Sequence, residues 1–376
     1  VFMMLFMGIQ ISRAQQAIGA FPNIDAGFEG QSNGSLPSGN PNASTTQWSY
    51  VTSGNGQTRT INATGGNGGP KYLSLGKTAP TTNTSTTANS NIISSGAFSQ
   101  NTNYIVQFHY KANAGIPDTS SFVFISMDGT SGGRDKKSLT TLGTPPASWT
   151  KFSTVVTTNG VTTPTTSGVA GINIRIVGTA NGTTSAVLDV DNFVVYKADN
   201  QTTPTADVIA PNAVTGLTAT SGPAIVNLAW NAPTGGVDGG GYIVVRYEAN
   251  PSAEPAPVQN AVYKATSTNT IGTGVVVYVG DSTRFSDASG VAGTSYFYRV
   301  YAVDKAFNYS NTPATSSAVA PLAKINYYYN GSGLASNLSN WGINTNGTGA
   351  HPVSLSSPGL VSVSYTHLTL PTILLV

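Results

Sequence analysis

Cysteine is absent from the chain, so no disulfide can cross-link it and no thiolate can act as a nucleophile or metal ligand. Histidine is scarce: the chain has three, and two of them, His351 and His367, lie close to the C-terminal end. With His109 as the only central histidine, the sequence offers no cluster of zinc ligands and little room for a Ser-His-Asp triad. A chain of this kind depends on core burial, with or without a bound metal.

Paired carboxylates that could cleave a glycosidic bond are also missing. Glycosidases need only two acids, one on each side of the scissile bond. Acidic residues between positions 22 and 199 are few, and most lie at predicted turns. Asp189 and Asp191, two positions apart in a predicted strand, share one face of it and do not flank a cleft. We therefore predict that the chain is not an enzyme.

Charge and long apolar segments are sparse as well. Charged residues make up 9% of the chain, and the formal net charge is +2. The one basic cluster, residues 134–137 (RDKK), predicts a solvated hairpin tip and not a nucleic-acid surface. The apolar run at residues 1–11 is too short to span a membrane. Small residues follow at Ser12 and Ala14, so residues 1–14 are predicted to be a signal peptide of a secreted or cell-surface protein.

What the chain does contain is typical of a turn-rich all-β protein, with 42 glycines and 21 prolines. In residues 104–111, apolar or aromatic side chains occupy every second position, and apart from Ile105 the positions between them are polar. Residues 172–176 do the same, with three isoleucines separated by Asn173 and Arg175. A period of two with one polar face indicates antiparallel β-sandwiches. Residues 78–90 are a Thr/Asn/Ser-rich segment of low complexity, which predicts a loop.

Three short stretches of the N-terminal half follow a common pattern: residues 27–30 (GFEG), 149–152 (WTKF) and 188–196 (LDVDNFVVY). Together they resemble the galactose-binding-like jelly rolls, which form many secreted carbohydrate-binding modules. The resemblance extends over about residues 22–199. It implies a jelly-roll β-sandwich domain at residues 15–199 and a polysaccharide or cell-surface glycan as the partner.

The resemblance also implies a structural Ca²⁺ site. In this family the first and last strands lie side by side and often share a calcium ion. Carried over to this chain, Glu29 and Asp191 are the expected side-chain ligands. Oxygen ligands from distant parts of a chain suit calcium, whose coordination geometry is permissive. The alternative is that the acids of the last strand, Asp189 and Asp191, simply point to solvent from a half-exposed strand.

A second domain is predicted after a polar linker at residues 200–210. Residues 226–230 (VNLAW), 242–246 (YIVVR) and 293–304 (GTSYFYRVYAVD) occur in the order found in fibronectin type III β-sandwiches, which residues 211–322 resemble. In the strand at 226–230, Val226, Leu228 and Trp230 share a face and are expected to form one wall of the core. Tyr296 lies where such folds place the tyrosine corner. An insertion between Glu248 and Val275 departs from the family and predicts an enlarged loop without an assigned role.

The C-terminal part divides into two segments. Residues 323–360 resemble the beginning of the repeated domains of large bacterial surface proteins, and alone they are too short to bury a core. Residues 363–372 (VSYTHLTLPT) resemble the translation of a sequencing adapter. We therefore predict that residues 361–376 are an assembly artefact.

A sugar site needs flat aromatic faces together with hydrogen-bonding side chains. The polar faces of the two alternating strands supply the second kind, and a tryptophan near one end of the domain supplies the first. The predicted ligand-binding residues are Gln107, His109, Lys111, Asn173, Arg175 and Trp48. The positive charges in this set would favour a glycan with acidic groups. For Trp48 the alternative is core packing, since large aromatic side chains are usually buried.

These features predict a non-catalytic, secreted or cell-surface protein fragment that binds glycans or mediates adhesion. One alternative is an ancillary binding and spacer region of a polysaccharide-degrading enzyme whose catalytic domain lies outside this chain. Another is a purely structural stalk. Fold alone does not separate the three, because each is compatible with tandem β-sandwiches.

Overall fold

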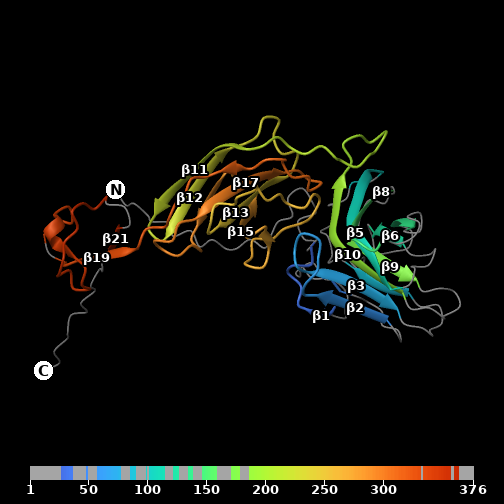
Figure 1. The fold of residues 1–376 in the computed structure, drawn as a ribbon, viewed down its shortest axis with the longest axis horizontal. Helices are drawn as coiled ribbons and strands as arrows, with labels where there is room; N and C mark the ends of the chain where they lie inside the picture. The colour runs from blue at the N-terminus through green and yellow to red at the C-terminus, as the bar shows by residue number, and fades with distance from the viewer. Residues whose placement is uncertain are drawn as a thin grey trace, which may run out of the picture.

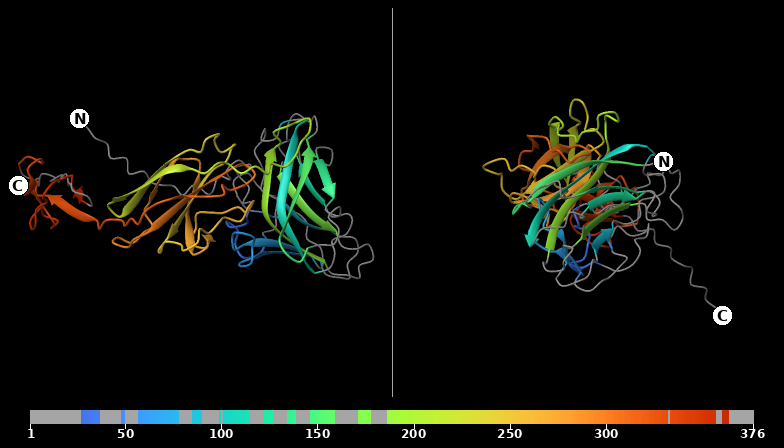
Figure 2. Two further views of the ribbon diagram at one scale, coloured as in Figure 1. Left: turned by 45° about the horizontal axis from the view of Figure 1, so that its top comes forward. Right: turned by 90° about the vertical axis from the view of Figure 1, so that its right-hand side faces the viewer.

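The computed structural model describes residues 27–36, 48–49, 57–77, 85–89, 99, 101–114, 122–126, 134–138, 146–158, 171–177, 186–331, 333–356 and 360–363. Two β-sandwiches and a small C-terminal unit lie in a row along the long axis (Figure 1 and Figure 2). Among the described residues, no helix is long and apolar enough to cross a membrane. The predicted signal peptide, residues 1–14, and residues 364–376 of the predicted artefact lie outside the described residues.

The first sandwich consists of two antiparallel sheets, which confirms the all-β fold class. Its six-stranded sheet has the order β1-β2-β3-β10-β5-β8, and its four-stranded sheet has the order β4-β9-β6-β7. The first sheet contains β1 (Gly34–Ser35), β2 (Gln57–Asn62), β3 (Tyr72–Lys77), β5 (Asn103–Ala114), β8 (Thr150–Thr157) and β10 (Ala186–Lys197). The second contains β4 (Ser85–Asn89), β6 (Phe122–Ser126), β7 (Arg134–Ser138) and β9 (Gly171–Val177).

Alternate residues of the six-stranded sheet form the core of the first sandwich. Phe108 of β5 stacks on Phe193 of β10, with ring centroids 4.9 Å apart and ring planes 6° from parallel. Trp48 is fully buried and meets the same Phe193 edge-on at 5.7 Å. Trp48 is therefore a core residue, and its expected place in an exposed sugar site is wrong because its indole fills the space between two phenylalanines, Phe28 and Phe193.

Two segments that were expected to be loops are strands. Residues 85–89, in the low-complexity segment, form β4 and pair with β9. Residues 134–138, which include the basic cluster, form β7 and pair with β6. Both strands lie at the edges of their sheet. Threonine favours extended backbone, and lysines on an edge strand hinder pairing with another chain, so both compositions are compatible with edge strands.

The second sandwich also has two sheets, with the orders β11-β12-β16 and β14-β15-β13-β17-β18. The first contains β11 (Thr215–Gly222), β12 (Ile225–Asn231) and β16 (Arg284–Asp287). The second contains β13 (Gly241–Tyr247), β14 (Thr270–Ile271), β15 (Gly274–Gly280), β17 (Phe297–Val303) and β18 (Ala314–Thr315). Val226, Leu228 and Trp230 are buried together, as predicted. The Tyr296 hydroxyl accepts a hydrogen bond from the Val291 backbone N–H at 2.9 Å, which confirms the predicted tyrosine corner.

The insertion at residues 248–273 is fastened to the outer face of the five-stranded sheet. The Arg299 guanidinium donates to both carboxylate oxygens of Glu254 at 2.8 Å. The Tyr247 hydroxyl donates to the Ile271 carbonyl at 2.9 Å, and β14 at the end of the insertion pairs with β15. The insertion therefore has a defined path, and it leads to the first sandwich (Figure 1).

The C-terminal unit is small. Its strands are β19 (Ile325–Tyr329), β20 (Trp341–Gly342) and β21 (Leu360–Val363), and a 3₁₀ helix covers Leu338–Asn340. β19 pairs with β21 in parallel, so the first residues of the predicted artefact take part in a strand. Among the described residues of this unit, Trp341 alone belongs to the buried hydrophobic core. The interpretation of residues 361–376 as an artefact stays a prediction.

We expect Trp230→Ala to lower the free energy of unfolding by about 3–5 kcal/mol, the usual effect of cutting a buried large aromatic to alanine. Trp230 is 5% exposed and packs edge-on against Tyr242 at 5.5 Å. Urea unfolding followed by circular dichroism measures the change. Ile209→Ala, at a side chain that is 79% exposed, is the control and should stay within about 0.5 kcal/mol of wild type. Equal midpoints for both variants would contradict the core role of Trp230.

Candidate functional site

The outer face of the six-stranded sheet is polar and carries most of the predicted site. Strand register places Asp189 beside Ser74 on one side and Lys111 on the other. In the next row, Asp191 pairs with His109, which pairs with Lys151. Because side chains alternate along a strand, these residues point away from the core residues between them.

The second sandwich covers one half of this face. Gln107 is 1% exposed and donates from its Nε2 to the Ala306 carbonyl of the second sandwich at 2.6 Å. Lys151 Nζ donates to Asn260 Oδ1 of the insertion at 3.0 Å. His109 is buried beside them. The expectation that Gln107 and His109 face solvent is therefore wrong, because the other domain lies on top of them.

His109 is uncharged at neutral pH in this setting. Burial, and to a lesser extent the neighbouring Lys151 ammonium, lowers the pKa of His109 to about 4. Its Nδ1 lies 3.5 Å from the Nδ2 atom of Asn192, which is also buried. A neutral, covered imidazole cannot supply a positive group to an acidic glycan. Of the three positive groups behind the predicted preference for acidic sugars, His109, Lys111 and Arg175, the first is therefore absent.

Arg175, another of the three positive groups, lies in a different sheet from His109 and Lys111. Asn173 and Arg175 belong to β9, which pairs with β4 and β6 in the four-stranded sheet, whereas Gln107, His109 and Lys111 belong to β5 in the six-stranded sheet. The five residues would form one surface only if the two strands were neighbours, and this condition is not met because β5 and β9 belong to different sheets. Lys111 lies 3.9 Å from the Asp189 carboxylate, so its charge is largely compensated.

The uncovered half of the outer face carries a pair of half-buried aromatic rings. Tyr72 and Trp149 meet edge-to-face, with centroids 5.4 Å apart. The Lys111 ammonium lies 4.6 Å from the Trp149 ring centroid and 5.1 Å from that of Tyr72. Trp149 Nε1 donates to the Gly65 carbonyl at 3.0 Å, so the indole reaches from the start of β8 across the face. We name Tyr72, Trp149, Lys111, Asp189 and Ser74 the aromatic patch.

Asp189 lies at the base of the aromatic patch and is fully buried. The Ser74 hydroxyl donates to Asp189 Oδ1 at 2.5 Å. Burial raises the pKa of Asp189, while Ser74, Lys111 and Asn113 partly offset that rise. The alternative in which Asp189 points freely to solvent is therefore wrong, since its carboxylate is enclosed by neighbouring polar side chains.

Tyr72 and Trp149 were not among the predicted site residues, although a signal for Tyr72 is present in the sequence. Leu73 and Leu75 both lie in the core, so Tyr72 and Ser74, at the alternate positions of β3, must face outward. Trp149 directly precedes β8, and its position over the sheet depends on a contact with Gly65, 84 residues earlier. The alternation of residues in β3 predicts that Tyr72 faces outward, whereas no local sequence pattern predicts that Trp149 lies over the sheet.

Glu29 and Asp191, the predicted calcium ligands, contact the same glycine-rich loop at residues 65–71. Glu29 Oε1 accepts from the Lys71 backbone N–H at 3.0 Å, and Asp191 Oδ2 accepts from that of Asn67 at 2.7 Å. Within the described residues, β1 and β10 are separated by β2 and β3. The expected side-by-side pairing of first and last strands is thus wrong for these strands, and the two acids instead contact different residues of one loop.

The loop can approach both acids because two of its residues lack a side chain. A Cβ atom on Gly69 would lie 2.2 Å from Glu29 Oε1, and one on Gly66 would lie 3.0 Å from Asp191 Oδ2. The Gly66 Cβ would also meet the Lys71 carbonyl oxygen at 2.4 Å. Carboxylate and carbonyl oxygens are the ligand type that calcium takes, so the donor chemistry at this loop suits that ion.

A second acidic group lies at the junction of the linker and the second sandwich. Asp199, Asp207 and Asp238 offer oxygens within 4.8 Å of one another, a set that could hold a metal ion. The Lys305 ammonium pairs with Asp199 and lies 2.9 Å from Asp238. A cation of the chain itself therefore already neutralises part of this group.

No protein-family model matches the chain, and no curated protein sequence matches it. Among solved structures, a β-1,2-glucanase from Parabacteroides distasonis is 17% identical and has a TM-score of 0.42 over 70% of this chain, which spans 34% of that enzyme. The CBM22-1 xylan-binding domain of Paenibacillus barcinonensis Xyn10C is 13% identical, with a TM-score of 0.25 over 44% of this chain and 92% of its own length. An Fn3-like protein from Clostridium thermocellum is 25% identical, with a TM-score of 0.21 over 28% of this chain and 90% of its own. Similarities of this size establish no family.

Proposed function

We propose that the chain is a non-catalytic glycan-binding part of a secreted or cell-surface protein, and that the aromatic patch holds the sugar. The observation that carries this proposal is the half-buried Tyr72–Trp149 pair, which lies beside Lys111 and the enclosed Asp189 carboxylate. Aromatic rings pack against the apolar faces of sugars, while neighbouring polar groups bond to hydroxyls. We retain the polysaccharide partner predicted from the sequence, but we assign its binding to the aromatic patch in place of the residues predicted from the sequence.

The charges of the aromatic patch favour a neutral glycan. The positive charge of Lys111 is balanced by Asp189 at 3.9 Å, and His109 is neutral and covered. Lys151, the next cation on the same face, donates to Asn260 and is directed into the domain contact. An acidic sugar would therefore meet no uncompensated positive charge among these residues.

The aromatic patch offers no pair of acids for glycosidic-bond cleavage. Asp191 accepts backbone hydrogen bonds at 2.7 Å from both Asn67 and Asn192, so its carboxylate is directed to the loop at 65–71 and to its own strand, away from the aromatic patch. Asp189 is enclosed at the base of the patch and lies on the same strand. A general acid and a base must flank the scissile bond from opposite sides. Binding without cleavage is the function that these residues support.

Trp149→Ala should weaken binding to a neutral polysaccharide about tenfold, since an aromatic contact contributes roughly 0.5–1.5 kcal/mol beyond its buried area. Tyr72→Ala should have a similar effect. A glycan array with neutral and acidic sugars identifies the ligand, and isothermal titration calorimetry with that ligand measures the change. Thermal unfolding of each variant verifies that the first sandwich stays folded.

Tyr327→Ala is the matched control, because Tyr327 is a half-exposed tyrosine in the C-terminal unit. Its affinity should equal that of the wild type. If both Trp149→Ala and Tyr72→Ala bind the glycan with wild-type affinity, the aromatic patch is not the sugar-binding site. A wild-type chain that binds no glycan on the array would leave the structural-stalk alternative in its place.

We further propose that Glu29 and Asp191 hold a structural calcium ion at the loop 65–71. The ion would supply positive charge beside two carboxylates that already accept hydrogen bonds from the Asn67 and Lys71 N–H groups and from the Asn269 amide. Calcium should raise the thermal midpoint of the chain relative to a chelator, because a ligand of the folded state stabilises it by about 2.7 kcal/mol at a hundredfold excess over Kd. Differential scanning calorimetry measures the shift.

Two variants locate the ion. In Asp191→Asn the calcium-dependent shift should disappear, whereas Asp207→Asn, in the second acidic group, should keep it. The reverse outcome would place the ion among Asp199, Asp207 and Asp238. A wild-type midpoint that is equal in calcium and in chelator would refute a calcium ion at either place.

A further inference from the structure

We propose that the insertion at residues 248–273 and the turn at residues 304–309 form a dock that joins the two sandwiches into one rigid, cooperatively folding unit. The second sandwich is then a structural wall of the first and not a flexible spacer. This inference is independent of the glycan proposal, because it concerns the covered half of the outer face. Apolar packing, buried hydrogen bonds and the stiffness of the dock each support it.

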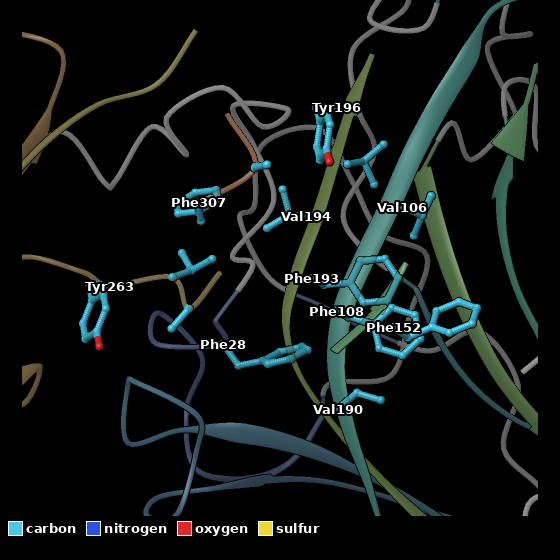
Figure 3. Close-up of a cluster of buried hydrophobic side chains, with 14 of the residues drawn as sticks. Phe28, Val106, Phe108, Phe152, Val190, Phe193, Val194, Tyr196, Tyr263 and Phe307 are labelled. Atoms are coloured by element: carbon cyan, nitrogen blue, oxygen red, sulfur yellow. The ribbon is translucent and has the colours of Figure 1, made fainter. Parts of the chain in front are cut away.

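Apolar packing is continuous from one sandwich to the other. Val194 and Tyr196 of β10 belong to the same buried cluster as Val262 and Tyr263 of the insertion and Phe307 of the turn. Figure 3 shows Phe307 facing Val194 across the contact, with Phe28 below them. All of these side chains are buried. Domains that move independently usually meet through more polar contacts, so a shared apolar cluster indicates a fixed arrangement.

Buried hydrogen bonds across the contact depend on docking. Asn192 Oδ1 accepts from the Val262 backbone N–H at 2.7 Å, and Gln107 Nε2 donates to the Ala306 carbonyl at 2.6 Å. Asn269 Nδ2 donates to Glu29 Oε2 at 3.1 Å. Separation of the sandwiches would break these bonds. Since a buried polar group without its partner is costly, the bonds favour the docked state and fix its geometry.

Hydrogen bonds within the second sandwich hold the turn at 304–309 in shape. Asp304 Oδ1 accepts from the backbone N–H groups of Ala306 and Asn308, both at 2.8 Å. Phe307 has a φ of 58°, a left-handed conformation that is unfavourable for a phenylalanine. Such a conformation persists where its surroundings determine it, and here it directs an aromatic side chain into the contact.

The linker between the sandwiches is fixed to both of them. Tyr196 of the first sandwich accepts from the Asp207 backbone N–H at 2.9 Å. Asn308 of the second sandwich donates to the Asp207 carbonyl at 3.2 Å. A linker that is bonded to both sandwiches through Asp207 keeps the docking surfaces at a high effective concentration, which strengthens the contact.

The experiment compares local stabilities in the full chain. Pulse-labelling hydrogen exchange along a urea series gives an unfolding midpoint for β5 and β10 of the first sandwich, and another for β13 and β17 of the second. In the wild type the two midpoints should coincide. In a Val262→Asp/Phe307→Asn variant they should separate, and small-angle X-ray scattering should show a wider distribution of distances between the sandwiches.

Val258→Asp is the matched control, since it places the same charge in the same insertion at a side chain that is 42% exposed. It should keep coincident midpoints and the wild-type scattering curve. Asparagine is chosen at position 307 because it tolerates the left-handed backbone. Distinct midpoints in the wild type would overturn the proposal without reference to any variant. A docking variant that retains coincident midpoints and wild-type scattering would overturn it as well.

Discussion

The arrangement of both sandwiches depends on the hydrogen bonds of one buried side chain, that of Asn192. Asn192 lies in β10 at an irregularity of the pairing with β5, and its φ of 53° is one that asparagine tolerates better than most residues. Its amide donates to the Asn67 carbonyl at 2.7 Å and accepts from the Val262 N–H at 2.7 Å. One buried amide therefore joins the last strand of the first sandwich, the glycine-rich loop and the insertion of the second sandwich.

This junction divides the outer face into two halves with different roles. On the covered half, Gln107 and Lys151 bond to the second sandwich. On the open half, the same sheet carries Tyr72 and Trp149 beside Lys111. The loop at 65–71 lies between the halves, since it bonds to Trp149 through Gly65 and to Asn192 through Asn67. The second sandwich therefore covers one part of a polar face and leaves the part with Tyr72 and Trp149 uncovered.

Periodicity in the sequence predicts on which face of a strand a residue lies, but not what covers that face. The inward faces of β5 and β12 and the tyrosine corner at Tyr296 were predictable because they depend on local alternation and spacing. Gln107 was correctly placed opposite the core, yet it is buried by a residue 199 positions away. Trp48 and Trp149 differ in burial through tertiary contacts, which no pattern of residue types encodes. The site was therefore predictable only in part.

The insertion explains why the dock can form at low entropic cost. It contains Pro251, Pro255 and Pro257, whose fixed φ angles restrict the unfolded chain and lower the entropy lost on folding. Glu254 anchors it to Arg299 of its own sheet, through an ion pair that does not involve the first sandwich. A segment that is already held in its bound conformation loses little freedom on association. In the proposed docked unit, the restricted conformation of the insertion therefore favours its association with the first sandwich.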